Sequence, residues 1–346
     1  KVDLSFDGKE NNYDYFVGYT NFSTDGESAM RDNEEKDGYR NDSLSMNYGY
    51  NINENFRVEN YLYYNDSLVE YDSVGKSQND IEASDDQHTS YTGRLINTIG
   101  NFKNTISYNN TYILRNTTGY NLAKTNYYGY RDAINLLSEY NFDLDNRIIF
   151  GLDNEFDAAE LKSYYAGNKY KESDEAIYSQ YFDLQLRLRE NTYTTFGLRR
   201  DDHTTAGDYY TGRATITYKV DNNTKLRGNL GTSVRFPSLN SYHHGHSLKN
   251  KESLKAETGK SIDIGIEKFF PENNISISAT TFFLEYKNDI KGWASHGGGL
   301  QYSYSGEADE YVIDNSNSKT ESYGLEFQTN WKLNNDYALG LGYTRT

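Results

Sequence analysis

The sequence predicts an all-β protein, an antiparallel transmembrane β-barrel to which this chain contributes about 16 strands. Three observations favour this fold class. Apolar and polar residues alternate with a period of two from one end of the chain to the other. The alternating segments run for roughly ten residues, the length of a membrane-spanning strand, whereas strands of soluble sheets average about five or six. Short turns alternate with long polar loops between the segments, which is typical of outer-membrane barrels.

The composition narrows the classes of function. Over 346 residues, 35 Lys and Arg stand against 51 Asp and Glu, which gives a net charge of -16. A nucleic-acid-binding surface needs a basic face, so nucleic acid is excluded as a partner. The absence of cysteine excludes disulfides, thiolate zinc sites and cysteine nucleophiles. Only 36% of the residues are hydrophobic, but 15% are aromatic, and this argues against a disordered chain.

The alternation is easiest to see in the segment 212–220. Its apolar face carries Ala214, Ile216, Tyr218 and Val220. Its polar face carries Arg213, Thr215, Thr217 and Lys219. A helical period of 3.6 would scatter these charges around the apolar stripe, so the segment is predicted to be a strand.

The same pattern defines every expected strand. In chain order the strands are predicted near 1–8, 13–22, 42–52, 56–66, 90–99, 103–114, 130–142, 147–157, 176–188, 192–202, 209–220, 224–234, 258–268, 274–286, 319–333 and 337–346. Short turns with residues such as Asn-Glu-Asn, Asp-Asn-Asn and Pro-Glu-Asn are expected near 9–12, 53–55, 100–102, 143–146, 189–191, 221–223, 271–273 and 334–336. Long polar loops are expected near 23–41, 67–89, 115–129, 158–175, 235–257 and 287–318, and the connection 203–208 is a short exception.

A soluble β-sandwich would also alternate, so the membrane prediction depends on strand length, on loop rhythm and on aromatic residues near the strand ends. Such an aromatic girdle would include Tyr48, Tyr50, Tyr218, Tyr323, Tyr337 and Tyr343. No apolar run approaches the roughly 18 residues that a membrane-spanning helix requires. Because Lys1 follows no initiator Met and Thr346 stops within an alternating segment, we expect the chain to be part of a longer polypeptide.

The stretch 197–346 resembles the barrel of the TonB-dependent outer-membrane receptors. The family's box Tyr/Phe-Lys/Arg-Ala-Pro-x-Leu is matched by Val234-Arg235-Phe236-Pro237-Ser238-Leu239. Its second box, Asn-Pro-x-Leu-x-Pro-Glu, is matched at Leu254 and Glu257, with Ala256 in place of the second proline. Lys251, after Asn250, stands in place of the first proline, with one extra residue before Leu254. Further on, FFLEYKNDIKGW resembles the strand that ends in Tyr-x-Asn-Asp-Ile, and ESYGLEFQTNW resembles the Gly-x-Glu strand. The first 196 residues match through strand and loop rhythm alone.

The resemblance implies a function in the outer membrane of a Gram-negative bacterium. It implies a receptor that takes up a scarce metal chelate, a cobalamin-, haem- or siderophore-like ligand, with overall likeness to the cobalamin group. Its partners would be outer-membrane lipid, the small chelate and the TonB energy-coupling complex, which acts through an N-terminal plug. Residues 1–346 contain no plug and would be one partial barrel domain. A passive porin and a surface β-rich binding protein are the alternatives.

Strand direction predicts how many strands are missing. Short turns face the periplasm, so the strand 1–8 runs towards it and one strand from the plug must precede it. The strand 337–346 runs outwards, so an odd number must follow. Receptors of this family close at 22 strands, which the resemblance divides into one before, 16 present and five after. The present strands should then form a sheet with two edges, at 1–8 and 337–346.

No enzyme motif is found in the sequence. Two tripeptides, Gly75-Lys76-Ser77 and Gly259-Lys260-Ser261, look like the end of a phosphate-binding loop, but the upstream Gly is absent from both. There is no Gly-x-Ser-x-Gly and no His-Glu-x-x-His. We therefore expect that the protein is not an enzyme.

A histidine cluster is the first candidate ligand site. It lies between the two boxes and consists of His243, His244 and His246, and His296 in the next long loop could join it. Neutral imidazoles suit haem iron and zinc, and the resemblance favours the haem interpretation because haem receptors carry a His between these boxes. The alternative is an ordinary polar loop.

Acidic loops are the second candidate, and no other cofactor is expected. The first two long loops contain Asp32, Asp37, Asp66 and Asp72. Carboxylate oxygens in flexible loops are the ligands that calcium prefers, and cobalamin receptors bind calcium through similar aspartates. The alternative is solvated loop charge. A third set of charges would line the lumen and pair with each other or with the plug: Arg187, Arg199, Arg213, Arg227, Glu267 and Glu326.

Overall fold

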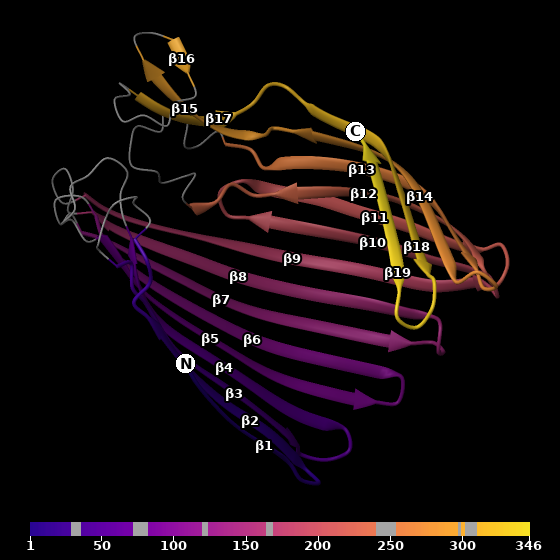
Figure 1. Ribbon diagram of the computed structural model, residues 1–346, viewed down its shortest axis with the longest axis horizontal. Helices are drawn as coiled ribbons and strands as arrows, with labels where there is room; N and C mark the ends of the chain where they lie inside the picture. Colours follow the sequence, from indigo (N-terminus) through magenta and orange to yellow (C-terminus); the bar gives the residue numbers. More distant parts are fainter. Residues whose placement is uncertain are drawn as a thin grey trace. The chain divides into compact units, whose positions relative to one another are not determined.

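A computed structural model describes residues 1–28, 36–71, 82–119, 124–163, 169–239, 254–296, 299–301 and 310–346 (Figure 1). The described elements are strands. They are β1 (Val2–Lys9), β2 (Tyr13–Thr24), β3 (Tyr39–Asn51), β4 (Phe56–Tyr71), β5 (Glu82–Ile99), β6 (Phe102–Thr118), β7 (Lys124–Asn141), β8 (Arg147–Ser163), β9 (Lys169–Arg189), β10 (Thr192–His203), β11 (Gly207–Lys219), β12 (Thr224–Arg235), β13 (Glu257–Phe270), β14 (Ile275–Lys287), β15 (Ile290–His296), β16 (Gly299–Gln301), β17 (Glu310–Asn315), β18 (Thr320–Lys332) and β19 (Ala338–Arg345).

Sixteen of these strands form one sheet in the order β1-β2-β3-β4-β5-β6-β7-β8-β9-β10-β11-β12-β13-β14-β18-β19. Every pair whose register is described is antiparallel. The fold class is thus confirmed, because each of the 16 predicted segments overlaps one strand of this sheet. The order begins with β1 and ends with β19, which are the two predicted edges. The chain divides into two compact units, one of residues 1–138 and 152–178, and one of residues 139–151 and 179–346.

Three of the predicted long loops are largely strand, so those predictions were wrong. The strands extend into 67–89, 115–129 and 158–175, and β9 reaches 21 residues. In the hairpin of β4 and β5, pairing continues to Tyr71↔Glu82. Where both faces of a hairpin meet water, both carry polar residues. The apolar alternation then fades although the backbone remains paired.

The predicted loop 287–318 also contains structure that the alternation does not reveal. Strands β15, β16 and β17 form a separate three-stranded sheet in the order β16-β15-β17. These strands are short, and β16 has only three residues. A period of two cannot be recognised over so few positions.

The apolar side chains of both units lie on an exposed face. Phe6 is 70% exposed, Leu198 69% and Ile264 60%. Among the described residues the buried hydrophobic side chains are few, and they are Ala133, Ala176, Leu254 and Ala256. A sheet whose apolar face has so little packed against it is typical of a strand array that is covered by lipid. Within the described part of the chain, no helix is long and apolar enough to cross a membrane.

Candidate functional site

The two boxes that the sequence singled out meet at the ends of two paired strands. Strand β12 ends at Arg235, and β13 begins at Glu257, directly opposite it. The Arg235 Nη1 and Glu257 Oε2 atoms are 3.1 Å apart, and the Glu257 side chain is only 12% exposed. The segment between the boxes therefore leaves and re-enters the sheet at one ion-paired position.

The first box anchors an aromatic stack. The Phe236 ring lies 4.5 Å from the His203 ring at 30°, and 5.6 Å from the Tyr209 ring at 78°. His203 and Pro237 are among the largest fully buried side chains of the described residues. Leu239 follows and is half-buried. Stacked and edge-to-face geometries of this kind add to the stabilisation from burial alone.

His203 also closes the short connection between β10 and β11. Its Nδ1 accepts hydrogen bonds from the backbone N–H groups of Thr205 and Ala206, both at 3.1 Å. Gly207 completes the turn with φ of 84°, which side chains other than glycine rarely adopt. The one short outer connection in the sequence, 203–208, is thus the structural partner of the first box.

The second box binds the same turn. Ala256 is completely buried, and its backbone N–H donates to the Tyr209 hydroxyl at 3.0 Å. Its carbonyl accepts from the Asn288 side chain at 3.3 Å. Proline, which the family's box has at this position, could not donate to Tyr209. The alanine that replaces the family's proline therefore makes a hydrogen bond that proline could not make.

The base of the three-stranded sheet is fastened to this region. The Asn315 amide accepts from the Lys255 N–H at 2.7 Å and donates to the carbonyl oxygens of Lys255 and Asn288, at 2.8 and 2.7 Å. Glu257 Oε1 accepts from the Ile290 N–H at 2.8 Å. We name His203, Tyr209, Phe236, Pro237 and Ala256 the box cluster. This cluster is a buried, hydrogen-bonded anchor at the two ends of the segment that contains the candidate histidines.

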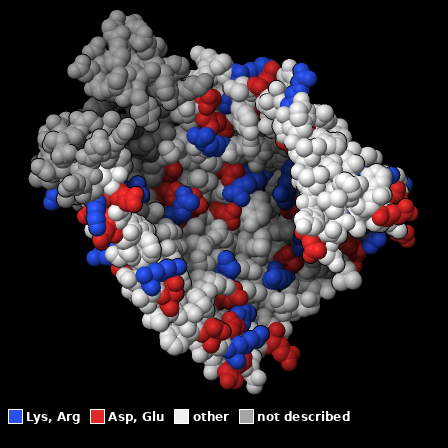
Figure 2. Space-filling model, viewed as in Figure 1, with Lys and Arg blue, Asp and Glu red and all other residues white. Residues whose placement is uncertain are grey.

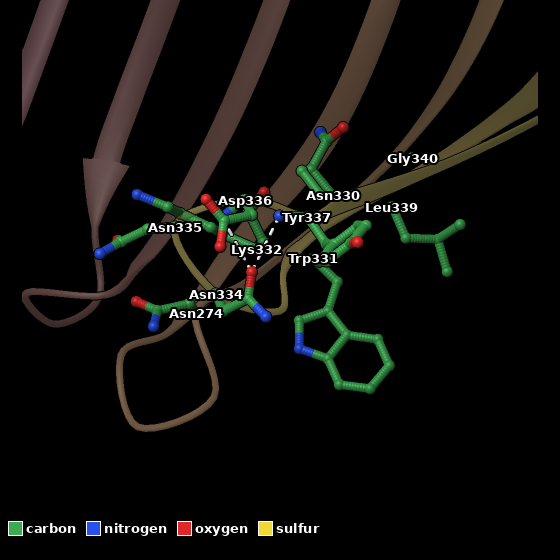
Figure 3. Close-up of a pocket in the computed structure, with 12 residues that line it drawn as sticks. Asn274, Asn330, Trp331, Lys332, Asn334, Asn335, Asp336, Tyr337, Leu339 and Gly340 are labelled. Carbon is green, nitrogen blue, oxygen red and sulfur yellow. Dashed lines mark hydrogen bonds between the residues drawn. The ribbon is translucent and has the colours of Figure 1, made fainter.

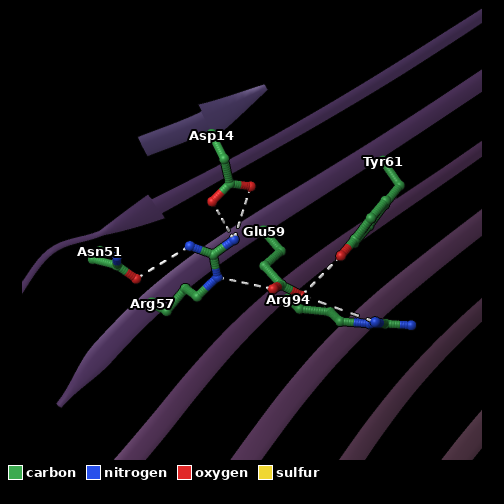
Figure 4. A network of polar contacts seen from close by, with 6 residues as sticks. All are labelled: Asp14, Asn51, Arg57, Glu59, Tyr61 and Arg94. Carbon is green, nitrogen blue, oxygen red and sulfur yellow. Dashed lines mark hydrogen bonds and ion pairs between the residues drawn. The ribbon is translucent and has the colours of Figure 1, made fainter. Parts of the chain in front are cut away.

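The polar face of the first unit carries a network of ion pairs (Figure 4). Arg57 Nη2 lies 2.8 and 3.0 Å from the two Asp14 oxygens, and its Nε is 2.9 Å from Glu59. Tyr61 donates to the other Glu59 oxygen at 3.0 Å, and Arg94 Nη1 lies 3.9 Å from it. Negative and positive groups thus alternate along the network from Asp14 through Arg57 and Glu59 to Arg94. Figure 2 shows basic and acidic residues next to one another on the face in view.

The second unit has similar pairs, and two of their carboxylates are deeply buried. Asp183 is 10% exposed, with Arg213 Nη2 at 2.5 Å. Asp201 is 5% exposed and accepts from Ser179 at 2.6 Å and from Arg199 at 2.8 Å.

Of the predicted lumen charges, Arg227 and Glu267 pair with each other, whereas the other three arginines pair with aspartates outside the predicted set. The pairs are Arg187–Asp145, Arg199–Asp201, Arg213–Asp183 and Arg227–Glu267. Glu326 lines a cavity of about 350 Å³ together with Arg227.

The short turns are closed by Asn and Asp side chains. Asn334 Oδ1 accepts from the N–H groups of Asp336 and of the girdle residue Tyr337, at 2.8 and 2.9 Å, next to Trp331 (Figure 3). Asp143 does the same for its turn, and the Asn146 side chain and the Asp145 N–H lower the pKa of its carboxyl. These caps explain why the turn residues could be recognised from sequence.

The candidate metal and haem ligands are mostly not described. Asp32, Asp72, His243, His244 and His246 lie outside the described residues, and only the backbone of His296, at the end of β15, is described. Asp66 accepts from Tyr64 and Gln87 and lies 3.8 Å from Arg40. Within the described residues, no three His, Asp or Glu side chains are grouped to hold a metal ion. Asp37 belongs to no such group, so haem and calcium binding remain predictions.

Comparison with known proteins shows which family the chain resembles. The family model described as TonB dependent receptor-like, β-barrel matches residues 2–346. The ferric enterobactin receptor of Pseudomonas aeruginosa is 23% identical over 199 residues, which cover 52% of this chain and 26% of that protein.

Two solved structures are similar along nearly the whole chain. The hemophore receptor HasR of Serratia marcescens, in complex with its hemophore HasA and heme, has a TM-score of 0.76 at 15% identity. The siderophore receptor PirA of Pseudomonas aeruginosa has a TM-score of 0.73 at 16% identity. Each comparison covers 99% of this chain, but only 60% and 61% of the relative. The chain therefore spans about three fifths of these structures, and at such identities they establish the fold alone.

Proposed function

Because the chain belongs to the TonB-dependent receptor-like β-barrel family, we propose that it is part of a receptor for energy-coupled uptake of a metal chelate across the outer membrane of a Gram-negative bacterium. The observation that carries this proposal is the family match along residues 2–346, together with 16 antiparallel strands in consecutive order. The exposed apolar face supports a location in lipid.

The relatives favour an iron chelate as the ligand. They are described as receptors of siderophore, of ferric enterobactin and of a hemophore with heme. None of these three is a cobalamin receptor, so the likeness to the cobalamin group stays a prediction. Coupling to the TonB complex would act through an N-terminal plug, as the family implies.

The polar face would serve the passage of the ligand. Two of its buried carboxylates pair with arginines: Asp183 of β9 with Arg213 of β11, and Asp201 with Arg199 within β10. Such pairing limits the field of either sign at these carboxylates, because each of the two has its counterion within hydrogen-bond distance.

Uptake in cells tests the proposal. The full-length receptor is expressed in a strain that lacks its own iron-chelate receptors, with and without a functional TonB complex. Radioactive iron is supplied as ferric enterobactin or haem, and labelled cobalamin is supplied in parallel. We expect uptake of one chelate that saturates at low concentration and requires the TonB complex. Uptake that is unsaturable and independent of TonB would establish the porin alternative instead.

A further inference from the structure

The apolar face of three neighbouring strands ends in a row of charges. In β13, β14 and β18 the register aligns the apolar-face residues in rows that cross the strands. From the short turns upwards, the rows are Phe270–Ile275–Trp331, Lys268–Ile277–Thr329, Ile266–Ala279–Phe327, Ile264–Thr281–Leu325 and Ile262–Phe283–Tyr323. At roughly 3.3 Å per residue and a tilt of about 40°, this band rises about 20 Å, close to the height of the apolar band in outer-membrane barrels.

The next row is charged throughout. Lys260 lies opposite Glu285, which lies opposite Glu321. Lys287 follows as the last residue of β14, and Lys319 directly precedes β18. We name these five residues the lysine rim, and they occupy the level where the headgroups of the lipids must begin.

The rim presents its positive charges to the surface. Glu285 is only 15% exposed, while Lys287 is 51% and Lys319 54% exposed, with Nζ atoms 3.2 and 3.5 Å from Glu285. Lys319 also lies 2.5 Å from Glu321. Lys260 forms no ion pair within the part of the chain that the structure describes. Three cations against two carboxylates leave a positive excess in a chain whose net charge is -16.

The corresponding level of the first unit has the opposite balance. There Asp42 and Asp66 lie opposite each other, directly above Leu44 and Tyr64 in the register. One cation, Arg40, stands between them at 3.7 and 3.8 Å. That cation is flanked by two carboxylates, so this position lacks the positive excess of the rim.

We propose that the lysine rim binds the phosphate-bearing headgroup of an anionic lipid whose acyl chains cover the apolar face below it. The ammonium groups are at the right level, they are exposed, and each retains donors beyond those used by the glutamates. This proposal rests on the outer-membrane location proposed above. The occupant follows from charge complementarity and from the continuity of the rim with the apolar band.

Lipid titration of the purified full-length receptor tests the proposal. Diphosphorylated lipid A is added in detergent, and bound lipid is counted by native mass spectrometry. A basic residue near an anionic surface contributes about 1 kcal/mol, or roughly fivefold in affinity. The triple variant K260Q/K287Q/K319Q should thus bind roughly a hundredfold more weakly. The triple Lys→Arg variant, which keeps the charge, should bind as the parent does.

Arg40→Gln is the matched control, because Arg40 is 56% exposed, much like the rim lysines, but is flanked by two carboxylates. It should leave binding unchanged. Inorganic phosphate should not compete, since the proposal requires a lipid seated on the apolar band. Equal binding by the parent and the triple Gln variant, or an equal loss in Arg40→Gln, would overturn the proposal. Chelate uptake is a separate measurement, so a receptor that transports but shows no rim-dependent lipid binding refutes the rim alone.

Discussion

The Tyr209 hydroxyl is predicted to hold the second box in place. The variant Tyr209→Phe keeps the ring against Phe236 but removes the acceptor of the Ala256 N–H, which lies 3.0 Å away. Ala256 is completely buried, so no water replaces the lost partner without local rearrangement. A buried donor without a partner costs about 1–3 kcal/mol. The free energy of local opening around residue 256 should fall by this amount, which corresponds to about a 5- to 150-fold faster amide exchange.

Hydrogen exchange of the full-length receptor in lipid nanodiscs measures the effect. The peptides that contain residues 254–257 should exchange faster in Tyr209→Phe, while those from the middle of β13 should not change. The matched control is Tyr210→Phe. Tyr210 is the next residue in β11 but is 74% exposed on the other face of the strand, so its hydroxyl has no comparable task.

The result that contradicts this reasoning is equally specific. If residues 254–257 exchange at the parental rate in Tyr209→Phe, the hydrogen bond contributes nothing to the anchor. If Tyr210→Phe accelerates the same peptides as much, the effect is a general loosening of β11. A uniform acceleration of all strands would show that the variant had lost global stability, in which case the local assignment would fail.

Three further predictions concern other parts of the chain. Asn146 and the turn backbone lower the pKa of Asp143, so the Asp143 carboxylate stabilises its turn fully above a pH of about 4 and loses this effect as the pH falls through the lowered pKa. Asp143→Asn should remove this acid-sensitive step from the hydrogen exchange measured at the turn. Gly197→Ala should lower the unfolding temperature, because the added Cβ would lie 2.8 Å from an Asp183 oxygen. The control Gly342→Ala, whose Cβ would meet open space, should have no effect. Equal unfolding temperatures of the two variants would contradict the clash. Replacing the three loop histidines, His243, His244 and His246, by Ala should weaken haem or metal binding without unfolding the barrel. Unchanged affinity for haem, zinc and cobalamin would show that these residues belong to an ordinary polar loop.

Most of the strand array could be predicted because one physical constraint shapes it. A strand with lipid on one side and polar groups on the other must alternate, and each of the 16 segments does so. The constraint ends where the lipid ends. Glu82, Ser84, Asp86 and His88 belong to β5 although neither face there is consistently apolar. The parts of the strands that extend into the predicted loops are held by backbone pairing, and backbone pairing does not require the side chains to alternate.

The edges follow from the same order. All eight residues of β19 are exposed, and so are seven of the eight in β1. Strands at such edges present backbone groups that need partners, and in lipid no water supplies them. The strands expected before β1 and after β19, and the total of 22, remain predictions.

The box cluster could be predicted only in part. The sequence identified Phe236 and Pro237 through the resemblance, but nothing indicated that His203 and Tyr209 would enclose them. These residues lie about 30 positions earlier, and a contact between separate hairpins has no periodicity to reveal it. The available signals were the unusual shortness of the connection 203–208 and its glycine. A single sequence shows that such a turn is special without showing what it packs against.

The weakest match to the family motif turned out to be the most informative position. Where the family's second box has proline, Ala256 has a backbone N–H, and burial obliges that group to find an acceptor. Tyr209 supplies it from a different hairpin. The two residues should therefore be coupled: Ala256→Pro should be better tolerated with Phe at 209 than with Tyr, because the proline ring would replace the N–H that points at the phenol oxygen. A double-mutant cycle in exchange rates measures this coupling, and strictly additive effects of the two substitutions would mean that the alanine and the tyrosine came together without depending on each other.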